Sequence, residues 1–440
     1  MQSIFLWERI RDMLFKNITI IDENIDIRGN MYIGIKDDKI DYISTEMPNK
    51  DYGQVYDGSG KVLMTAFFNC HAHSPMALMR GYGENMVLQD WLNKRIFPFE
   101  DHLDENATYW GTMLCLAESI KFGIASTSDM YMFCEDIARA YLDVGCKGNI
   151  SRGIAAFKDE PLFETYRGKE SMTLFENWHN AENGKIKVDM SIHAEYTSVP
   201  GIVRELADYA KKIGVGVQVH ISETEKEHCE CIERHGKTPT QYFAELGLFD
   251  VPVQAAHGVW LTSEDIDIFK EKNATVVCNI ISNLKLSSGV CNIPALLNKG
   301  VNIALGTDSV ASNNNLNFFE EIKMFSLVPK MHFKDPTVIT PKQAIYAATT
   351  AGAKAQGRED CGKLAVGYKA DLIVVDACSA NMQPIHNLLN NVVYSIAPTD
   401  LIMTIVDGKV LYEKGEYKTL DIERITFEVD KATKDILNKL

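Results

Sequence analysis

Residues 62–73, VLMTAFFNCHAH, decide more about this protein than any other stretch of its sequence. The apolar run from Val62 to Phe68 begins after Gly60 and ends at polar residues, which is typical of a buried strand. Residues two apart on an extended chain point to the same side. His71 and His73 are therefore expected to leave the end of that strand side by side, as a pair of nitrogen ligands for a metal such as zinc.

Short apolar, β-branched runs recur along the middle of the chain and alternate with helical patterns. The strand candidates are Val62–Asn69, Ala125–Met130, Gly148–Ala155, Lys187–His193, Gly216–His220, Val253–His257, Ala274–Asn279 and Asn302–Thr307. The clearest helical patterns are Ala107–Phe122, Asp136–Val144, Gly201–Ile213, Ser263–Lys272 and Leu316–Leu327. This alternation over about 250 residues predicts an α/β fold built as a (β/α)8 TIM-like barrel. An open doubly wound sheet is the competing architecture, because strand order cannot be read from the sequence.

The two flanks of the chain have a different pattern, with short alternating strands and turn signals such as Asp407-Gly408. We expect residues 13–61 and 364–420 to pair into one small β-sandwich domain. Residues 62–363 would then form the catalytic barrel, and residues 421–440 a C-terminal helix. The segment before Met13 has two interpretations, a helical extension or a start-site artefact, so the sequence does not decide whether residues 1–12 are native.

The composition narrows the classes of function. The chain has 440 residues, of which 46% are hydrophobic, and a formal charge of −15 at pH 7. Such an acidic chain is unsuited to a nucleic-acid backbone, and no apolar run approaches the roughly 20 residues that cross a bilayer. The first residues lack the features of a secretory signal, and ten cysteines in such a chain are most simply reduced thiols. We therefore predict a cytoplasmic protein that binds neither nucleic acid nor membranes.

More polar side chains stand where apolar strands end, the edge at which barrels of this kind carry their chemistry. They are His220, His257, Asp308 and, on the loop three residues after His220, Glu223. Any one of these side chains has an ordinary structural explanation. Their repeated occurrence at strand ends, together with His71 and His73, favours a single shared site.

These residue types predict metal-assisted hydrolysis. One divalent ion held by His71, His73, His220 and Asp308 would retain an open position for water. Zinc suits these ligands best, with iron or manganese as alternatives. Such an ion lowers the pKa of bound water from ~15.7 toward ~7, which gives a nucleophilic hydroxide at neutral pH. Asp308 can accept the proton of that water, His257 can orient the nucleophile, and Glu223 can protonate a carbon–nitrogen substrate.

A single metal ion is expected rather than two. A second, bridging ion usually requires a carboxylate or a modified lysine at the end of the fourth strand. That strand ends in His193, and the nearest lysine of that kind, Lys158, follows the third strand instead.

Together these motifs make the sequence similar to the amidohydrolase superfamily, in its mononuclear deaminase branch. The resemblance is carried by His71-x-His73, His220-x-x-Glu223, His257, Gly306-Thr307-Asp308 and the run from Gly362 to Leu372. Within that branch, further segments resemble the 5-methylthioadenosine/S-adenosylhomocysteine deaminases: Ser74–Gly81, Trp91-Leu92, Phe97–Glu100 and Ala311–Asn314. The resemblance covers nearly the whole chain.

The resemblance implies an enzyme and adds residues that bind the substrate. The ribose-binding glutamate of the family matches Glu100, and its substrate-lining arginine and histidine match Arg152 and His193. Glu223 also contacts the substrate, and Trp91 is expected either beneath the base or in the core. One departure is Glu195, two residues after His193, where many relatives have proline. This extra acid is expected near the mouth of the site and bears on which nucleoside substituent is accepted.

We therefore predict hydrolytic deamination of an adenosine-type nucleoside, such as 5-methylthioadenosine, S-adenosylhomocysteine or adenosine, to the inosine-type product and ammonia. The first alternative is an aminohydrolase or chlorohydrolase that acts on guanine, a pterin, cytosine or a triazine. A third possibility, from another class, is an inactive amidohydrolase-like binding protein. The partner is thus a small molecule, and a homo-oligomer, dimer or tetramer, is expected because such barrels often assemble.

Overall fold

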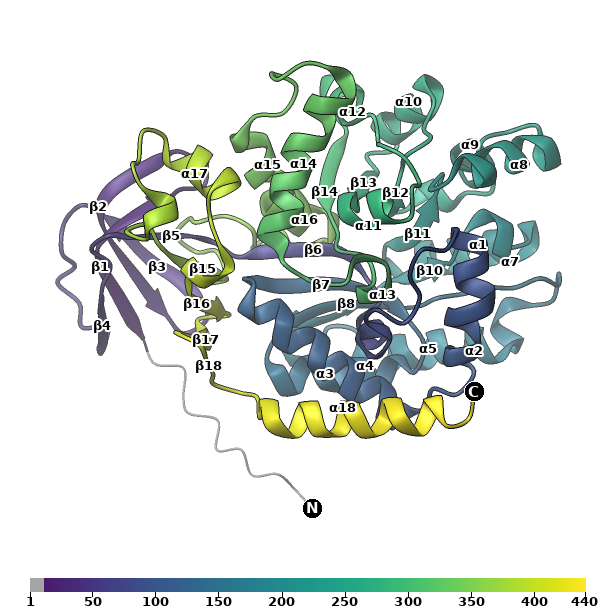
Figure 1. The fold of residues 1–440 in the computed structure, drawn as a ribbon, viewed down its shortest axis with the longest axis horizontal. Coiled ribbons are helices and arrows are strands. Elements are labelled where there is room, and N and C mark those ends of the chain that lie inside the picture. The colour runs from purple at the N-terminus through teal and green to yellow at the C-terminus, as the bar shows by residue number, and fades with distance from the viewer. Residues whose placement is uncertain (1–11) are drawn as a thin grey trace.

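The computed structural model describes residues 12–440, so the two interpretations of the segment before Met13 concern residues that lie almost entirely outside it. The centre is built from parallel strands joined by helices (Figure 1). One sheet contains β6 (Phe67–Ala72), β7 (Ile124–Tyr131), β8 (Lys147–Arg152) and β9 (Ile186–Val188). The second contains β10 (Met190–Ile192), β11 (Val217–Ile221), β12 (Val253–His257), β13 (Thr275–Cys278) and β14 (Asn302–Leu305).

Helices lie between successive parallel strands, which confirms the predicted α/β alternation. The five predicted helices are present as α3 (Glu105–Lys121), α4 (Cys134–Val144), α7 (Pro200–Ile213), α10 (Ser263–Glu271) and α14 (Phe318–Phe333). Further helices are α1 (Leu88–Trp91), α2 (Phe97–Glu100), α5 (Tyr166–Trp178), α8 (Glu225–His235), α9 (Pro239–Glu245), α11 (Ile280–Lys285), α12 (Ile293–Lys299), α13 (Val310–Asn313), α15 (Pro341–Ala348), α16 (Thr350–Ala355) and α17 (Leu388–Tyr394).

Local sequence explains where these elements begin and end. The Asp104 side chain accepts a hydrogen bond from the Ala107 N–H (2.8 Å) and so caps the start of α3. Helix α7 starts at Pro200 and stops at Gly214, whose φ of 75° glycine adopts without strain. Every residue of β11 and β12 is buried, as expected for parallel strands covered on both faces.

Backbone contacts connect the parallel sheets at both of their junctions. Between β8 and β10, Ile154 and Ile192 form a parallel bridge, and the His193 N–H donates to the Ile154 carbonyl (2.9 Å). Between β14 and β6, the Asp308 N–H donates to the His71 carbonyl (2.9 Å). The carboxyl ends of strands from both sheets therefore face one region.

The prediction of one strand over Val62–Asn69 is wrong in one respect. The chain forms two strands there, β5 (Lys61–Thr65) and β6, which belong to different sheets. The change occurs at Ala66, whose N–H donates to the Asp371 carbonyl (2.9 Å). The residues from Val62 to Phe68 are buried and, apart from Thr65, apolar, so the hydrophobic pattern continues across the change of sheet. His71 consequently lies within β6, and His73 follows its end.

The predicted strand Lys187–His193 is also divided, into β9 and β10. The division falls at Asp189, a buried residue whose carboxylate accepts hydrogen bonds from Asn149, Gln218 and Gln254. Strand β9 pairs with β8, whereas β10 pairs with β11, so Asp189 marks the boundary between the two parallel sheets.

The two flanks of the chain meet in one nine-stranded sheet (Figure 1). Its N-terminal strands are β1 (Met13–Ile21), β2 (Ile27–Lys36), β3 (Lys39–Ser44), β4 (Gln54–Asp57) and β5, and its C-terminal strands are β15 (Leu372–Asp376), β16 (Leu401–Val406), β17 (Lys409–Glu413) and β18 (Glu416–Tyr417). Strand β5 joins the two groups, because it pairs with β1 on one side and with β15 on the other. Residues of both groups share a separate hydrophobic core.

A buried ion cluster fastens this terminal sheet to the parallel strands. Lys147, the first residue of β8, contacts the carboxylates of Asp371 and Asp407, which flank β15 and β16. Lys185 and Lys369 lie 3.5 Å and 3.9 Å from Asp407. Burial opposes ionisation of Asp407, but the lysines outweigh it and lower its pKa to about 2.

The chain ends in α18 (Ile422–Leu437), which lies along α3 (Figure 1). The Arg424 guanidinium lies 5.2 Å from the centroid of the Trp110 ring of α3. Within residues 12–440, no helix combines the length and the apolar character needed to cross a membrane.

Candidate metal centre

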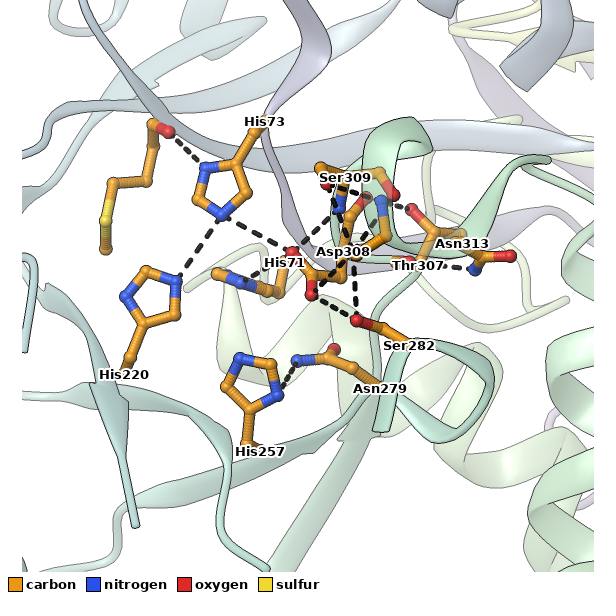
Figure 2. Close-up of polar contacts among 12 residues, drawn as sticks. His71, His73, His220, His257, Asn279, Ser282, Thr307, Asp308, Ser309 and Asn313 are labelled. Carbon is orange, nitrogen blue, oxygen red and sulfur yellow. Dashed lines mark hydrogen bonds and ion pairs between the residues drawn. The ribbon is translucent and has the colours of Figure 1, made fainter. Parts of the chain in front are cut away.

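Five side chains from four strand ends converge on one small space (Figure 2). His71 comes from β6 and His73 follows it, His220 lies in β11, His257 ends β12, and Asp308 follows β14. Their ligand atoms form two overlapping groups, each within 4.8 Å: His71 with His220 and His257, and His71 with His73 and Asp308. These five residues are the ones that the sequence predicted to form a metal site, from their positions at the ends of strands.

Backbone carbonyls fix the orientation of two of these imidazoles. The Nδ1 atoms of His73 and His220 lie 2.6 Å from the carbonyl oxygens of Met130 and His193, respectively. Because a carbonyl oxygen only accepts hydrogen bonds, both Nδ1 atoms carry the proton. The two Nε2 atoms are then lone-pair donors, yet they face each other at 3.4 Å. A metal ion between the two opposed lone pairs would relieve their repulsion.

The donor set fits a divalent metal ion. His73 Nε2 and His71 Nε2 lie 3.4 Å and 3.5 Å from the same oxygen of Asp308, and His71 Nε2 is buried without a hydrogen-bond partner. Two donors bound tetrahedrally at about 2.1 Å from zinc stand about 3.4 Å apart, which matches these separations. Burial lowers the pKa of His71 to about 4 and that of His220 well below its usual value, so both imidazoles are neutral at neutral pH, the form in which histidine can bind a metal.

Hydroxyl and amide groups brace Asp308. Ser282 Oγ (2.6 Å) and Ser312 Oγ (3.1 Å) donate to one carboxylate oxygen, and the Ser309 N–H donates to the other (2.7 Å). Asp308 itself has a φ of 59°, a left-handed backbone that is uncommon for a residue with a side chain. The oxygen that faces the histidines is therefore held in one direction (Figure 2).

His257 and Glu223 form a second pair beside the histidines. His257 Nδ1 donates to Asn283 Oδ1 (2.8 Å), and its Nε2 lies 3.8 Å from Glu223 Oε2. Burial alone would lower the pKa of His257, but the carboxylates of Glu223 and Asp308 outweigh it and raise that pKa. Burial raises the pKa of Glu223, which suits a group that carries a proton. Ser288 Oγ donates to Glu223 Oε1 (3.2 Å).

A cavity of about 760 Å³ opens above this cluster. Its lining includes all the predicted site residues except His71, which lies beneath it: His73, Trp91, Glu100, Arg152, His193, His220, Glu223, His257 and Asp308. This volume is in the range of pockets that hold small organic ligands.

The predicted substrate-binding residues are tied to neighbouring groups. Glu100 Oε1 accepts from the Tyr131 hydroxyl (2.6 Å), and burial raises the pKa of Glu100. Arg152 Nε donates to Glu170 Oε2 (2.5 Å), and another of its nitrogens donates to the Gly153 carbonyl (2.7 Å). Both side chains are thus held at the cavity wall.

His193 and Trp91, two further predicted substrate-binding residues, also lie in the cavity wall. His193 Nδ1 pairs with Thr197 Oγ1 (3.0 Å), and burial lowers the pKa of His193 to about 4. Trp91 is both buried and part of the cavity lining, so its two predicted positions, core and substrate platform, are compatible. Its indole N–H has no hydrogen-bond partner within the described chain.

Glu195 is not part of the cavity lining, contrary to the expectation of an extra acid at the mouth of the site. Its buried carboxylate binds Arg234 and, at 2.9 Å, His235 Nε2. A charge this deeply buried is paired within the protein rather than offered to a substrate.

Several site residues were not predicted. They are Asp129, Tyr131, Glu227, Asn279, Ser282, Asn283, Ser288 and Ser312. Four of them carried a sequence signal: Asn279 ends a predicted strand, Asp129 and Tyr131 stand at the end of another, and Ser312 lies in the segment Ala311–Asn314. Glu227, Ser282, Asn283 and Ser288 come from a loop or from the first turns of helices, where nothing in the local pattern distinguishes them.

Comparisons with known proteins agree with this geometry. The model of the amidohydrolase family matches residues 62–411, and the chain belongs to that family. A 5-methylthioadenosine/S-adenosylhomocysteine deaminase of Caldanaerobacter subterraneus subsp. tengcongensis is 38% identical over 97% of this chain and 99% of its own. A 5'-deoxyadenosine deaminase of Methanobrevibacter smithii is 35% identical over 97% of each chain.

A solved structure extends the comparison to the fold. An adenosine deaminase of Xanthomonas campestris, crystallised with bound zinc, superposes with a TM-score of 0.90 and 25% identity over 97% of this chain and 99% of its own. With the family match, this similarity identifies the α/β fold as TIM-barrel-like.

Proposed function

We propose that this protein catalyses the hydrolytic deamination of an adenosine-type nucleoside, in which water replaces the 6-amino group and ammonia is released. The observation that carries the proposal is the opposition of His73 Nε2 and His220 Nε2 beside Glu223, in a cavity of nucleoside size. It is supported by full-length similarity to enzymes named as deaminases of methylthioadenosine, S-adenosylhomocysteine and 5'-deoxyadenosine.

In this proposal one divalent ion, zinc in the first instance, is held by His71, His73, His220 and Asp308. The unpartnered Nε2 of His71 and the opposed lone pairs of the other two histidines support this assignment. When bound, such an ion supplies Lewis acidity that makes a water molecule reactive near neutral pH. Zinc in the Xanthomonas enzyme supports the choice of metal, and iron or manganese are the alternatives.

The protein's own residues would move the protons. Asp308 accepts a proton from the attacking water, and Glu223 donates one to the ring nitrogen next to the attacked carbon. His257, with its raised pKa, stabilises negative charge as the amino-bearing carbon becomes tetrahedral. Glu223, now ionised, takes the remaining proton of the added hydroxyl group and passes it to the amino group, which leaves as ammonia; the proton held by Asp308 restores the acid form of Glu223.

Substrate contacts are assigned to the walls of the cavity. Glu100 would accept hydrogen bonds from ribose hydroxyls, and Arg152 and His193 would contact the remainder of the nucleoside. Trp91 offers an indole face to the base and an unpaired N–H.

The alternative reaction, on another heterocycle, uses the same activation of water, although a chloride leaves as the anion and needs no proton. An inactive binding protein would use none of these steps. One experiment separates the three. Purified protein is analysed for divalent metals and then assayed for ammonia release from adenosine, methylthioadenosine, S-adenosylhomocysteine, guanine and cytosine. We expect about one metal ion per chain and release from the nucleosides only. Activity confined to guanine or cytosine would support the alternative, and inert protein after addition of zinc, iron or manganese would support the binding protein.

We also propose the finer architecture predicted from the sequence. The parallel strands of residues 62–363 close into a single barrel, which the Asp308–His71 backbone hydrogen bond and the Ile154–Ile192 bridge support. Residues 13–61 and 364–420 act as one sandwich around their shared core, followed by a helix in residues 421–440. Homo-oligomeric assembly and a cytoplasmic location stay predictions.

A further inference from the structure

We propose that Glu227 is a positioning residue for Glu223, because it holds the backbone from which the Glu223 carboxylate projects. The inference rests on the proposed function, since it gives Glu227 a part in the same proton transfer. Glu227 lies in the first turn of α8 and does not line the cavity. It would act on the reaction only through Glu223.

Both oxygens of the Glu227 carboxylate bind the chain that leads to Glu223. Oε1 accepts from the Ser222 N–H (3.0 Å), and Oε2 accepts from the Glu223 N–H (2.8 Å). The side chain is 5% exposed, so these hydrogen bonds are protected from water. One carboxylate thereby fixes two consecutive peptide groups immediately before the reacting side chain.

The turn that it fixes has an unusual backbone. Ser222 has a φ of 50°, in the left-handed region that residues with a side chain rarely adopt. The Ser222 carbonyl accepts from the Val259 and Trp260 N–H groups, both at 3.1 Å. Such a conformation persists only where the surroundings enforce it. The hydrogen bonds that Ser222 forms with Glu227 and with the loop after β12 hold the turn in this conformation. The turn thereby places the Glu223 side chain in the cavity wall.

Capping of α8 does not by itself explain Glu227. Thr224 already caps this helix, because its hydroxyl accepts from the Glu227 N–H (3.1 Å). Among the described residues, no lysine or arginine forms an ion pair with Glu227, so a buried carboxylate is a costly choice. A carboxylate nevertheless offers two acceptor oxygens, whereas the amide of glutamine offers one. In the structure each oxygen accepts from one N–H group, and glutamine would replace one of these oxygens with an NH2 group that cannot accept.

The carboxylate of Glu223 is held at its other end by Ser288 and His257. Loss of the Glu227 contacts would release the backbone end and leave the hydrogen bond from Ser288. A displacement of about 1 Å in a catalytic group can cost on the order of a hundredfold in rate. The predicted consequence is a loss of turnover with little change in substrate or metal binding.

The test is Glu227→Gln, an isosteric change that places an NH2 group against one of the two N–H donors. We expect kcat to fall by about tenfold to a hundredfold, KM to change by less than about threefold, and metal content to be unchanged. The matched control is Glu225→Gln, in the same turn of α8 but exposed, which should retain kcat. Thr224→Ala removes the helix cap and should lower Tm while kcat is retained.

A double variant separates positioning from a general structural role. In the Glu223→Gln background, the further change Glu227→Gln should cause no additional loss of kcat, because the group that it positions is already disabled. The proposal is overturned if the two losses multiply, or if Glu227→Gln lowers only Tm. Should the wild type release ammonia from a different heterocycle and not from nucleosides, the proposed substrate is wrong, and the same comparison of Glu227 variants is made with that heterocycle.

Discussion

At the residue scale, main-chain atoms decide what the histidines of the metal centre can do. The carbonyls of Met130 and His193 bind the Nδ1 atoms of His73 and His220, and so direct both Nε2 lone pairs inward. Such partners orient metal-binding imidazoles and increase their basicity. The backbone provides this effect, and the side chains at positions 130 and 193 take no part in it.

The first prediction concerns Glu223. Glu223→Gln removes the proton carrier but none of the proposed metal ligands, so the variant should retain its metal while kcat falls by about 10²–10⁴-fold. Metal analysis and steady-state kinetics on the same preparation test this. His73→Ala serves as the contrast, because it should lose metal as well as activity. Loss of metal from the Glu223 variant would contradict the role assigned to it.

A second prediction concerns Glu100. If its carboxylate binds ribose hydroxyls, Glu100→Ala should raise KM for nucleosides by about tenfold or more and leave KM for free adenine nearly unchanged. Tyr131→Phe removes the hydroxyl bound to Glu100. It should also raise KM for nucleosides and not for adenine, but by a smaller factor. An equal rise in KM for adenine would show that Glu100 does not contact the ribose.

Much of the candidate site could be predicted because its residues share one position, the end of a buried strand. His71, His73, His220, His257 and Asp308 all follow that rule. Ser288, Asn283 and Glu227 could not be predicted, since each acts through a contact between segments that the sequence does not show to be neighbours. Glu195 illustrates the opposite error, because proximity in sequence to His193 does not make it part of the cavity.

At the element scale, the sequence predicted where extended segments lie but not which sheet each one joins. The run Val62–Phe68 is apolar apart from Thr65, yet it changes sheets at Ala66. Asp189 similarly divides β9 from β10. Each boundary is set by the strands with which the two segments pair, such as β15 for β5 and β8 for β9. Hydrophobic periodicity carries no information about which strands pair.

A third prediction belongs to helix α14, which buries Glu321. Asn313 donates to its carboxylate (2.7 Å), and burial raises the pKa of Glu321 to about 8. In the unfolded chain this group ionises near pH 4.5. Its contribution to stability is therefore fully present below about pH 4.5 and is lost as pH rises through about 8.

Glu321→Gln keeps the acceptor for Asn313 and cannot ionise. The variant should be more stable than the wild type at pH 8, by on the order of 3 kcal/mol, and the difference should shrink toward pH 5. Thermal unfolding at both pH values measures the change. The exposed neighbour Glu320→Gln is the control and should show no such pH-dependent difference.

At the scale of the whole molecule, the ion cluster of Lys147, Asp371 and Asp407 joins the terminal sheet to the parallel strands. The pKa of Asp407, lowered to about 2, means that its contribution to stability is present above about pH 3.8 and is lost as pH falls through about 2. Removing one partner of a buried ion cluster leaves its lysines under-compensated.

A fourth prediction follows for Asp407→Asn. At pH 7 the variant should be less stable than the wild type by about 2 kcal/mol, and the two should converge as pH falls through about 2. Denaturant unfolding measures the free energy at each pH. Asp430→Asn breaks an exposed pair with Lys434 on α18 and should cost less than about 0.5 kcal/mol. A similar loss in both variants would show that the buried cluster has no special effect.

The place of β5 between β1 and β15 has a consequence for biosynthesis. A ribosome makes Leu63 long before Val374, its partner across the sheet. The early strands must therefore wait, with one edge unpaired, until almost the entire polypeptide has been translated. Nascent chains stalled before residue 372 should expose that edge to chaperones and proteases, and release of the completed chain should protect it.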